Sequence, residues 1–447
     1  MSAATDSMTL TGSAERYRVI AAGICALILT VGLARFAYTP MLPIMRAEAG
    51  LSYLAGGWLA TFNYLGYITG VLIAASISDL GRKHQLYRVG LVVALVSTAA
   101  MGMTSDLTLW VALRFVSGLS STAGLLLASG LVLDWLMRHG HRPELGLHFA
   151  GLGLGILVSG LAVAAMVGRL PWDQQWIGLS LLGIAFLLPA WWWLPAPAGS
   201  RAGTSAVAGP RPSARWMGLL IGAYFCGGFG YVVSATFIVA ILDRIPLLTG
   251  KGEWIWVMVG LAAVPSCWLW DRVAAARGQI PALILAYGLQ VVSIILPTLT
   301  AASVLNLASA VLYGGTFVGI VSLTLSLVGR CFPDNPAKAM ARLTLSYGVA
   351  QIVAPAMAGY MASVTGSYQG ALVVAAAVML IGMLLLLVLE RHDREFPGIG
   401  QRRWLVRARP CRTRGRTPRR PALLHAADAS VRSSAAGDPG QACHGVE

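Results

Sequence analysis

The sequence predicts an all-α polytopic membrane protein with twelve transmembrane helices in two six-helix, pseudo-symmetric bundles. Three observations predict this class. The 447 residues are 57% hydrophobic and only 11% charged, with a mean hydropathy of +0.70, whereas a soluble domain is about 25% charged. Apolar stretches fill residues 18–390, and nearly all reach the roughly 20 residues that a helix needs to cross a bilayer. The Lys and Arg residues between them fall on alternate loops.

The first half of the chain supplies six of these helices. Lipid offers no hydrogen bonds, so each spanning segment satisfies its own backbone as a helix. The first helix follows a polar segment, 1–17, and is much longer than the apolar core of a signal peptide, so we expect it to be retained. Trp191, Trp192 and Trp193 end the sixth helix, as aromatic anchors do at head-group level. The six predicted spans are 18–45, 53–78, 86–105, 107–136, 146–168 and 174–194.

A linker separates these helices from a second set of six. Residues 195–215 are rich in Pro, Gly, Ala and Ser, which is the composition of a flexible connection. We therefore expect one bundle at 18–194 and another at 216–390, followed by a basic tail, 391–447, that has too few large apolar residues to fold. The second set of predicted spans is 216–242, 253–270, 279–300, 302–329, 342–364 and 368–390.

The charge asymmetry of the loops sets the orientation. One set of loops and ends carries 17 basic residues, and the opposite set carries only Arg46, Arg169, Arg244 and Lys251. Basic residues near membrane helices favour the cytoplasmic side, so both termini, with the segment 1–17, are predicted to be cytoplasmic. Membrane lipid is then an expected partner, and the protein is expected to be a monomer.

Composition also argues against other classes of partner. Ten of the 33 basic residues lie in the last 46 positions, so the net charge of +15 reflects topology and tail rather than a nucleic-acid surface. The six cysteines form no CxxC pair. His139, His141, Glu144 and His148 come from a short loop and a helix start, with no arrangement that closes a tetrahedral metal site. We expect neither a metal nor a cofactor.

Two charged residues within the membrane are the most informative. Arg35 in the first helix and Arg114 in the fourth both fall in the outer half of the bilayer, where a charge costs about 3 kcal/mol or more. No Asp or Glu occurs in the middle of any predicted helix. Two buried cations without a buried acid predict an anionic substrate, or pairing with backbone carbonyls. The structural alternative is that one arginine pins neighbouring helices together.

Polar and aromatic side chains of other helices are candidates for the same site. Asn63 and Gln351 would be costly against lipid and are expected to face inward, while each tyrosine fits either packing or ligand contact. His148 is the candidate for proton coupling, because imidazole changes charge near neutral pH. The predicted binding or coupling set is Arg35, Arg114, Tyr38, Asn63, Tyr67, His148, Tyr231, Tyr347 and Gln351.

A cytoplasmic loop carries the first resemblance to a known family. The stretch Ser78-Asp79-Leu80-Gly81-Arg82-Lys83 resembles the signature loop of the major facilitator superfamily, although Ala75 replaces its leading Gly and one residue is missing. The resemblance implies that this loop clamps the cytoplasmic side of a carrier. Asp134 and Arg138, spaced to pair on one helix face, are added to this gate. The predicted cytoplasmic gate is Asp79, Arg82, Lys83, Asp134, Arg138, Asp271 and Arg272.

Longer stretches extend the resemblance over most of 18–390. Arg114-Phe-Val-Ser-Gly118 resembles the helix 4 motif of the superfamily, whose Arg serves coupling or binding. The glycines between Gly151 and Gly160 lack the Pro of the antiporter motif, which weakens an antiport reading. GLARFAYTPMLP (32–43), NYLGYITG (63–70), HFAGLGLGILVSG (148–160) and FGYVVSATFIVA (229–240) resemble the uncharacterised YbfB/YjiJ-type branch.

The resemblance implies a bacterial inner-membrane permease. We expect a secondary active transporter that moves a small organic, plausibly anionic, solute by alternating access, with protons as a candidate coupling ion. Uptake and efflux both fit the sequence. Two alternatives stay open at this point: a non-transporting membrane sensor on a carrier fold, and a polytopic membrane enzyme, for which only 134–148 offers a sparse cluster of ionisable residues.

Overall fold

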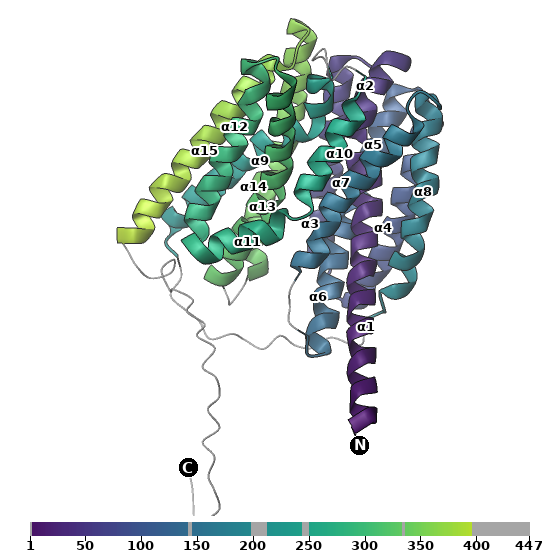
Figure 1. The fold of residues 1–447 in the computed structure, drawn as a ribbon, viewed down its shortest axis with the longest axis vertical. Coiled ribbons are helices and arrows are strands. Elements are labelled where there is room, and N and C mark those ends of the chain that lie inside the picture. The colour runs from purple at the N-terminus through teal and green to yellow at the C-terminus, as the bar shows by residue number, and fades with distance from the viewer. Residues whose placement is uncertain (1, 142–144, 198–211, 244–249, 333–335, 396–447) are drawn as a thin grey trace, which may run out of the picture. The chain divides into compact units, whose positions relative to one another are not determined.

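A computed structural model describes residues 2–141, 145–197, 212–243, 250–332 and 336–395. Within these ranges the secondary structure is helical, with no strand. The helices, two of them short π-helical segments, are α1 (Ser2–Leu27), η1 (Ile28–Phe36), α2 (Tyr38–Glu48), α3 (Tyr53–Ser76), α4 (Leu80–Met101), α5 (Leu107–Thr122), η2 (Ala123–Ala128), α6 (Ser129–Arg138), α7 (Gly146–Met166), α8 (Trp172–Trp193), α9 (Ala214–Leu242), α10 (Gly252–Ala263), α11 (Ser266–Arg277), α12 (Gln279–Leu299), α13 (Ser303–Cys331), α14 (Pro336–Thr365) and α15 (Gln369–Glu395) (Figure 1).

Every predicted span coincides with a helix or a run of helices. In the described part of the chain, nine helices are long and apolar enough to cross a membrane, and the bent pair α10 and α11 makes a tenth. The two remaining spans, α4 and α14, are long enough but are not apolar enough to be among these helices. The fold class is confirmed, and the count of twelve stays a prediction.

Several helices begin earlier than the apolar pattern indicates, because polar side chains cap them. Asp79 accepts a hydrogen bond from the Arg82 backbone N–H at 2.7 Å, so α4 begins at Leu80 rather than at residue 86. Ser213 caps α9 in the same way, accepting from the Trp216 N–H at 3.1 Å, and α9 begins at Ala214 rather than at residue 216. The first helix begins at Ser2, within the predicted segment 1–17.

Prolines account for the two largest irregularities. Pro265 lies between α10 and α11, whose axes differ by 41°, since a proline ring clashes with the preceding turn and donates no N–H. Pro40 follows η1, where each carbonyl pairs with the N–H five residues ahead. The Arg35 carbonyl would need the missing N–H of Pro40, so this segment leaves an acceptor for another helix to satisfy.

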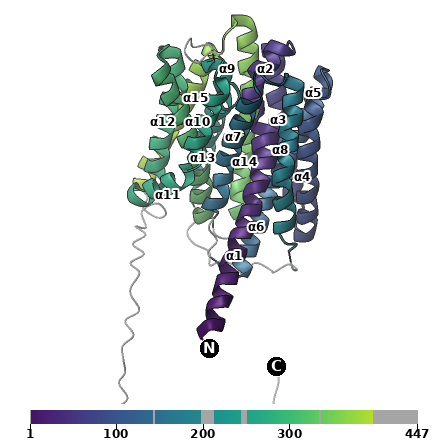
Figure 2. The same cartoon turned by 45° about the vertical axis from the view of Figure 1, so that its right-hand side comes forward.

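The helices pack in two groups that follow the halves of the sequence. In the first half α3 packs on α5 and α4 on α8, and in the second half α9 packs on α15 and α12 on α13. Figure 2 shows the second-half helices in green beside the purple and blue first-half helices. The linker falls mostly on 198–211 and the tail on 396–447, outside the described residues. The domain boundaries therefore stay predictions.

Among the described residues, the main contacts between the halves are those of α3 with α14 and of α7 with α10, and α2 also packs on α9. The first two are pairs of the second helix of one half with the fifth helix of the other, as a pseudo-symmetric arrangement requires. Glycines let the backbones meet: a Cβ on Gly57 would lie 2.6 Å from the Pro355 carbonyl oxygen and 2.9 Å from the Gly359 Cα. A Cβ on Gly153 would lie 2.4 Å from the Val264 nitrogen. Gly153 and Gly160 of α7 thus face α10 across the seam between the halves, whereas Gly151 and Gly155 face the first helix.

Candidate functional site

Arg35 is a buried cation held by aromatic faces. Its side chain is 4% exposed, and its guanidinium carbon lies 4.4 Å from the ring centroid of Tyr64 and 4.6 Å from that of Tyr67. Among the described residues the guanidinium makes neither an ion pair nor a hydrogen bond, and its Nε is buried without a partner. Contacts with ring faces use none of the N–H donors. The guanidinium N–H donors of Arg35 are therefore free to bind a group that is not part of the described chain.

Arg114 is equally buried but is occupied by the backbone of the first helix. Its guanidinium donates to the Ala34 carbonyl at 3.1 Å and to the Arg35 carbonyl at 3.5 Å, and it lies over the Tyr38 ring at 4.4 Å. The second of these carbonyls is the acceptor that Pro40 leaves without an N–H. Arg114 thus holds in place the backbone that carries Arg35. This is the structural alternative of the sequence analysis, in which one arginine pins neighbouring helices together.

Asn63 and Tyr38 belong to the same backbone network. The Asn63 amide donates to the Arg114 carbonyl at 2.9 Å, and the Ser117 hydroxyl donates to the Ala34 carbonyl at 2.7 Å. The Tyr38 hydroxyl donates to the Gly56 carbonyl at 2.9 Å, which ties α2 to α3. Both residues face inward as predicted, and both hold neighbouring helices behind Arg35.

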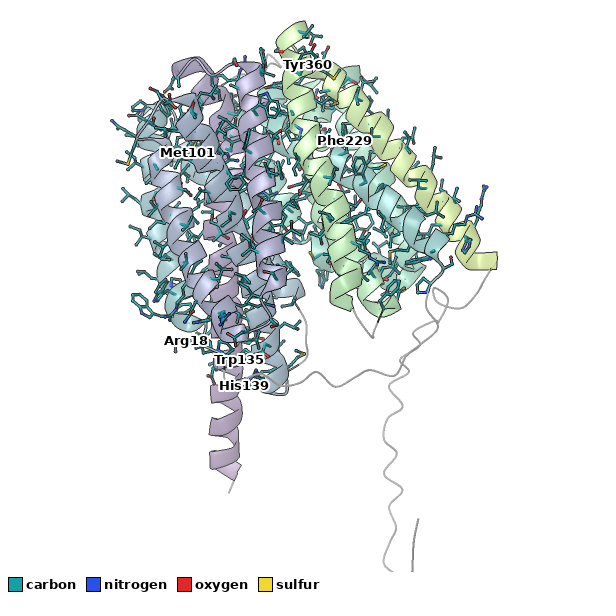
Figure 3. The ribbon with its side chains drawn as sticks, turned by 180° about the vertical axis from the view of Figure 1, so that it is seen from behind. Arg18, Met101, Trp135, His139, Phe229 and Tyr360 are labelled. Carbon is teal, nitrogen blue, oxygen red and sulfur yellow. The ribbon has the colours of Figure 1, made fainter. Side chains whose placement is uncertain are left out.

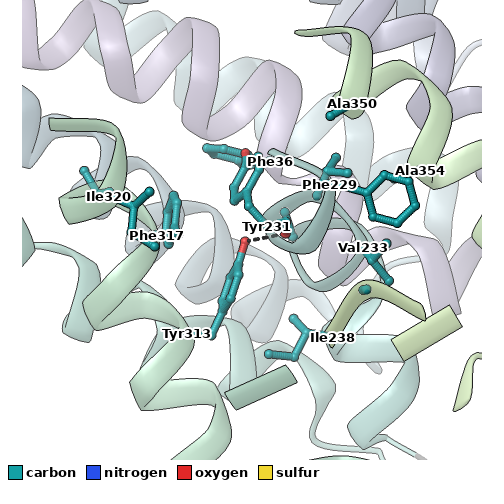
Figure 4. Close-up of a cluster of buried hydrophobic side chains, with 14 of the residues drawn as sticks. Phe36, Phe229, Tyr231, Val233, Ile238, Tyr313, Phe317, Ile320, Ala350 and Ala354 are labelled. Atoms are coloured by element: carbon teal, nitrogen blue, oxygen red, sulfur yellow. Dashed lines mark hydrogen bonds between the residues drawn. The ribbon is translucent and has the colours of Figure 1, made fainter. Parts of the chain in front are cut away.

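The second half brings a group of aromatic rings toward this cation. Tyr231 lies next to Tyr64 and within electrostatic range of Arg35. The Tyr313 hydroxyl donates to the Tyr231 carbonyl at 3.3 Å, as Figure 4 shows. The rings come from α9, α13 and α14, and we call them the aromatic cluster: Tyr224, Tyr231, Tyr313, Phe317 and Tyr347.

Gln351 continues the α14 face that carries Tyr347. It lies four residues, about one helical turn, after that tyrosine, so the two side chains project on the same side. Its side chain is 3% exposed, and its amide oxygen is buried without a hydrogen-bond partner among the described residues. Its burial agrees with the expected inward orientation, and the Asn63 amide oxygen is likewise buried without a partner among the described residues.

His148 lies elsewhere, within the first half. It is fully buried on α7, and its Nε2 is 2.8 Å from the Ser129 hydroxyl on α6. Its Nδ1 is next to Gly23 of α1, where an added Cβ would lie 2.4 Å away, and this nitrogen is without a partner in the described part of the chain. The structure gives it no contact with the aromatic cluster among the described residues.

The predicted gate residues engage their own helices. Asp79 caps the helix that it begins rather than a facing helix, with Arg82 exposed and Lys83 half-buried beside it. Asp134 and Arg138 form the predicted pair, with 2.8 Å between the carboxylate and Nε.

The second-half gate residues differ in their surroundings, because Arg272 contacts its own helix and Asp271 is within electrostatic range of Arg330 on α13. The Arg272 guanidinium lies 4.1 Å from the Trp268 ring centroid, and Asp271 beside it is exposed. The described ranges hold no group of three or more His, Cys, Asp or Glu placed to bind a metal ion.

Five residues of the site were absent from the predicted set: Tyr64, Ser117, Tyr224, Tyr313 and Phe317. Tyr64 contacts Arg35 more closely than the predicted Tyr67 does, and its position three residues earlier on the same helix face could have shown this. Phe317 follows Tyr313 by four residues, which is the same signal. Ser117 offers no comparable pattern, because serine is common at helix contacts in membranes.

Comparison with known proteins agrees with this architecture. The family model described as "Uncharacterised MFS-type transporter YbfB" matches residues 27–387, MFS being the major facilitator superfamily. The niacin transporter NiaP of Acinetobacter baylyi is 26% identical over 150 residues, which are 34% of this chain and 31% of that protein. The gallate transporter of Pseudomonas putida is 26% identical over 193 residues, or 43% of this chain and 42% of that one. The chain thus spans less than half the length of these curated relatives.

Solved structures share the fold at low sequence identity. The nucleoside transporter NupG has a TM-score of 0.65 at 11% identity, covering 84% of this chain and 99% of its own. A bacterial homologue of the human lysosomal transporter Spinster, inward-facing and unoccupied, has a TM-score of 0.61 at 14% identity, covering 85% and 98%. All these proteins are transporters, in keeping with the expectation that the chain is not an enzyme. The chain belongs to the family of YbfB-type transporters of the major facilitator superfamily and is a multi-pass membrane protein.

Proposed function

We propose that the chain is a secondary active carrier that moves a small organic anion across the bacterial inner membrane, with Arg35 as the residue that binds the anion. The single observation that carries this proposal is the state of Arg35, which is 4% exposed and makes no hydrogen bond to the described chain. A buried cation without a counter-charge is costly. An anionic substrate is the group that offsets this cost, and a guanidinium binds a carboxylate in bidentate fashion.

The relatives support an anionic substrate. Niacin and gallate, the compounds that name two of the matching transporters, are both carboxylates at neutral pH. The matching regions cover only part of each protein, so the geometry around Arg35 carries more weight than these names.

Arg114 has a different part in this proposal. Its donors already bind the carbonyls of Ala34 and Arg35, so it acts on the substrate through the position of Arg35. Lysine cannot replace it, because a single ammonium lacks the planar fork that reaches two carbonyls. Arg114→Lys should therefore weaken substrate binding although the charge is kept.

Alternating access is the mechanism that fits the contacts between the halves. Thr39 of α2 donates to the Ala235 carbonyl, and Thr61 of α3 donates to the Ile352 carbonyl at 3.1 Å. The Thr39 bond and the contact of Gly57 with Gly359 lie toward the end that the charge pattern places outside. At the opposite end, Asp79, Asp134 and Arg272 make contacts within their own helices. This is the pattern of a carrier whose two halves are held together on the outer side and not on the cytoplasmic side.

The ends of the chain fit the proposed topology. In Figure 1 the beginning of α1 and the end of α15 lie toward the same end of the described helices. Figure 3 places Arg18, Trp135 and His139 together at that end and Tyr360 at the other. Cysteine labelling in intact cells should find Tyr360→Cys accessible from outside and His139→Cys only after the membrane is permeabilised. The reverse pattern would overturn the orientation.

Proteoliposomes test the transport proposal. Labelled nicotinate and gallate serve as first probes, with protein-free vesicles as the blank and the surface variant Arg169→Gln as the matched control. We expect flux in the wild type and in Arg169→Gln, and at least a tenfold loss in Arg35→Gln. Wild-type flux in Arg35→Gln would remove Arg35 from the site, and no anion flux in the wild type across a panel of carboxylates would refute the proposed function.

A further inference from the structure

The rings of the aromatic cluster are nearly parallel. Tyr231 lies 5.3 Å from Phe317, 5.7 Å from Tyr347 and 6.4 Å from Tyr313 between ring centroids, with interplanar angles of 21°, 26° and 13°. Tyr347 and Tyr224 are 4.5 Å apart at 30°. The cluster therefore forms a row of ring faces with a common orientation, supplied by three helices of the second half.

Aromatic contacts elsewhere in the described residues are of both kinds: Phe237 and Tyr368 also stack, at 24°, whereas other pairs meet edge to face. Phe36 and Trp256, which meet across the two halves, form an edge-to-face pair at 70°, and Trp110 and Trp172 form one at 87°. Edge-to-face and offset-stacked pairs are both favourable, so packing alone does not require one orientation. What distinguishes the cluster is that a row of five rings shares one orientation beside an unpaired cation.

Three features of this part of the protein bear on the ligand. The first is Arg35, with free N–H donors. The second is the row of ring faces, which Tyr231 brings next to Tyr64 and within electrostatic range of Arg35. The third is the Gln351 amide oxygen, buried without a hydrogen-bond partner among the described residues, one turn beyond Tyr347. A buried acceptor of this kind needs a donor in the functional state.

We propose that the substrate is a flat aromatic carboxylate. Its carboxylate binds the Arg35 guanidinium, and its ring extends the row of the aromatic cluster at Tyr231 and Tyr347. A donor on the ring, such as a hydroxyl, hydrogen-bonds to the Gln351 amide oxygen. This inference rests on the proposed function, because it names the class of anion that the Arg35 site takes.

Binding to the purified full-length protein tests the proposal with two probes of the same charge and similar size. Benzoate has a flat ring, whereas cyclohexanecarboxylate has none, so isothermal titration of both isolates the contribution of the ring. We expect benzoate to bind about tenfold more tightly, the size of a favourable aromatic contact. Addition of a ring hydroxyl, in 4-hydroxybenzoate or 3-hydroxybenzoate, should tighten binding further, by about fivefold for one new hydrogen bond.

Variants assign these differences to residues. Tyr231→Leu should reduce the preference for benzoate to threefold or less, while Tyr360→Leu, an exposed tyrosine on α14, should leave it unchanged. Gln351→Leu should remove the gain from the hydroxyl and keep the affinity for benzoate. Arg35→Gln should weaken both probes equally. Because the comparison of probes is made in the wild type, it stands even if a variant fails to fold.

The outcomes separate this inference from the proposed function. Equal affinity for the two probes, with both lost in Arg35→Gln, overturns the aromatic class and keeps the anion site. A preference for benzoate that Tyr231→Leu leaves intact overturns the assignment to the aromatic cluster. No carboxylate binding in the wild type overturns both proposals.

Discussion

Arg35 and Arg114 offer a sharp test, because their environments predict opposite effects on the stability of the empty carrier. Both are buried arginines in the first half, and methionine replaces each with a flexible apolar side chain of similar length. Arg35→Met removes an unpaired charge and two contacts with ring faces. Arg114→Met removes a charge that makes two hydrogen bonds and one ring contact.

The magnitudes follow from these contacts. Relief of an uncompensated buried charge contributes about 4 kcal/mol to stability, and each desolvated cation–π contact removes about 1.5 kcal/mol. Arg35→Met is therefore expected to be about 1 kcal/mol more stable than the wild type. For Arg114→Met the two charge-assisted hydrogen bonds add a loss of about 4.5 kcal/mol, which leaves the variant about 2 kcal/mol less stable.

Thermal unfolding of the purified proteins in one detergent, without substrate, measures the difference. A gap of about 3 kcal/mol corresponds to a separation in Tm of roughly 3 °C, because the entropy of unfolding grows with chain length. Arg35→Met should melt at or above the wild-type temperature and Arg114→Met clearly below it. If Arg35→Met falls as far as Arg114→Met, Arg35 has a structural role and the argument for a free anion-binding group fails.

Three further predictions follow from local contacts. Gly57→Leu should push α3 away from α14 and abolish transport. The control variant Gly130→Leu, where an added Cβ meets nothing within 4 Å, should transport normally. Transport by Gly57→Leu would show that the seam can open there without cost. Asp134→Asn should shift the Tm by less than 2 °C, because a partly exposed ion pair contributes about 0.5 kcal/mol, and a larger drop in calorimetry would reveal a structural gate. Ser129→Ala removes the only hydrogen bond of the His148 ring to the described residues. If His148 couples protons, the pH profile of flux in proteoliposomes should shift. An unchanged profile would argue against that role.

Most of the fold was predictable from the sequence because lipid imposes a single strong rule on every span. The predicted 279–300 and the observed α12 differ by one residue at one end. The errors occur where polar caps extend a helix beyond its apolar segment, as at Asp79. The π-helical η1 was not predictable, because the carbonyls of Ala34 and Arg35 near its end are satisfied by Arg114 and Ser117 of another helix.

The residue types of the site were predictable, but the different roles of Arg35 and Arg114 were not. The cost of burying a charge identified Arg35 and Arg114 together, and nothing in the sequence separated them. Their difference arises from packing, since α5 places Arg114 against the carbonyls near Pro40 and α3 places only ring faces against Arg35. Sequence spacing along one helix cannot report which neighbour a side chain meets on another.

The contact of Gly57 with Gly359 has a consequence for the kinetics of the carrier. Where two backbones touch without side chains between them, no rotamers need to rearrange when the helices part and none need to be found again when they return. Movement at this point loses mainly weak dispersion contacts, each about 0.1–0.2 kcal/mol per atom pair. A contact of this kind lowers the energy barrier to separation of the two helices, so they separate often. Interdigitated leucines at the same place would raise that barrier.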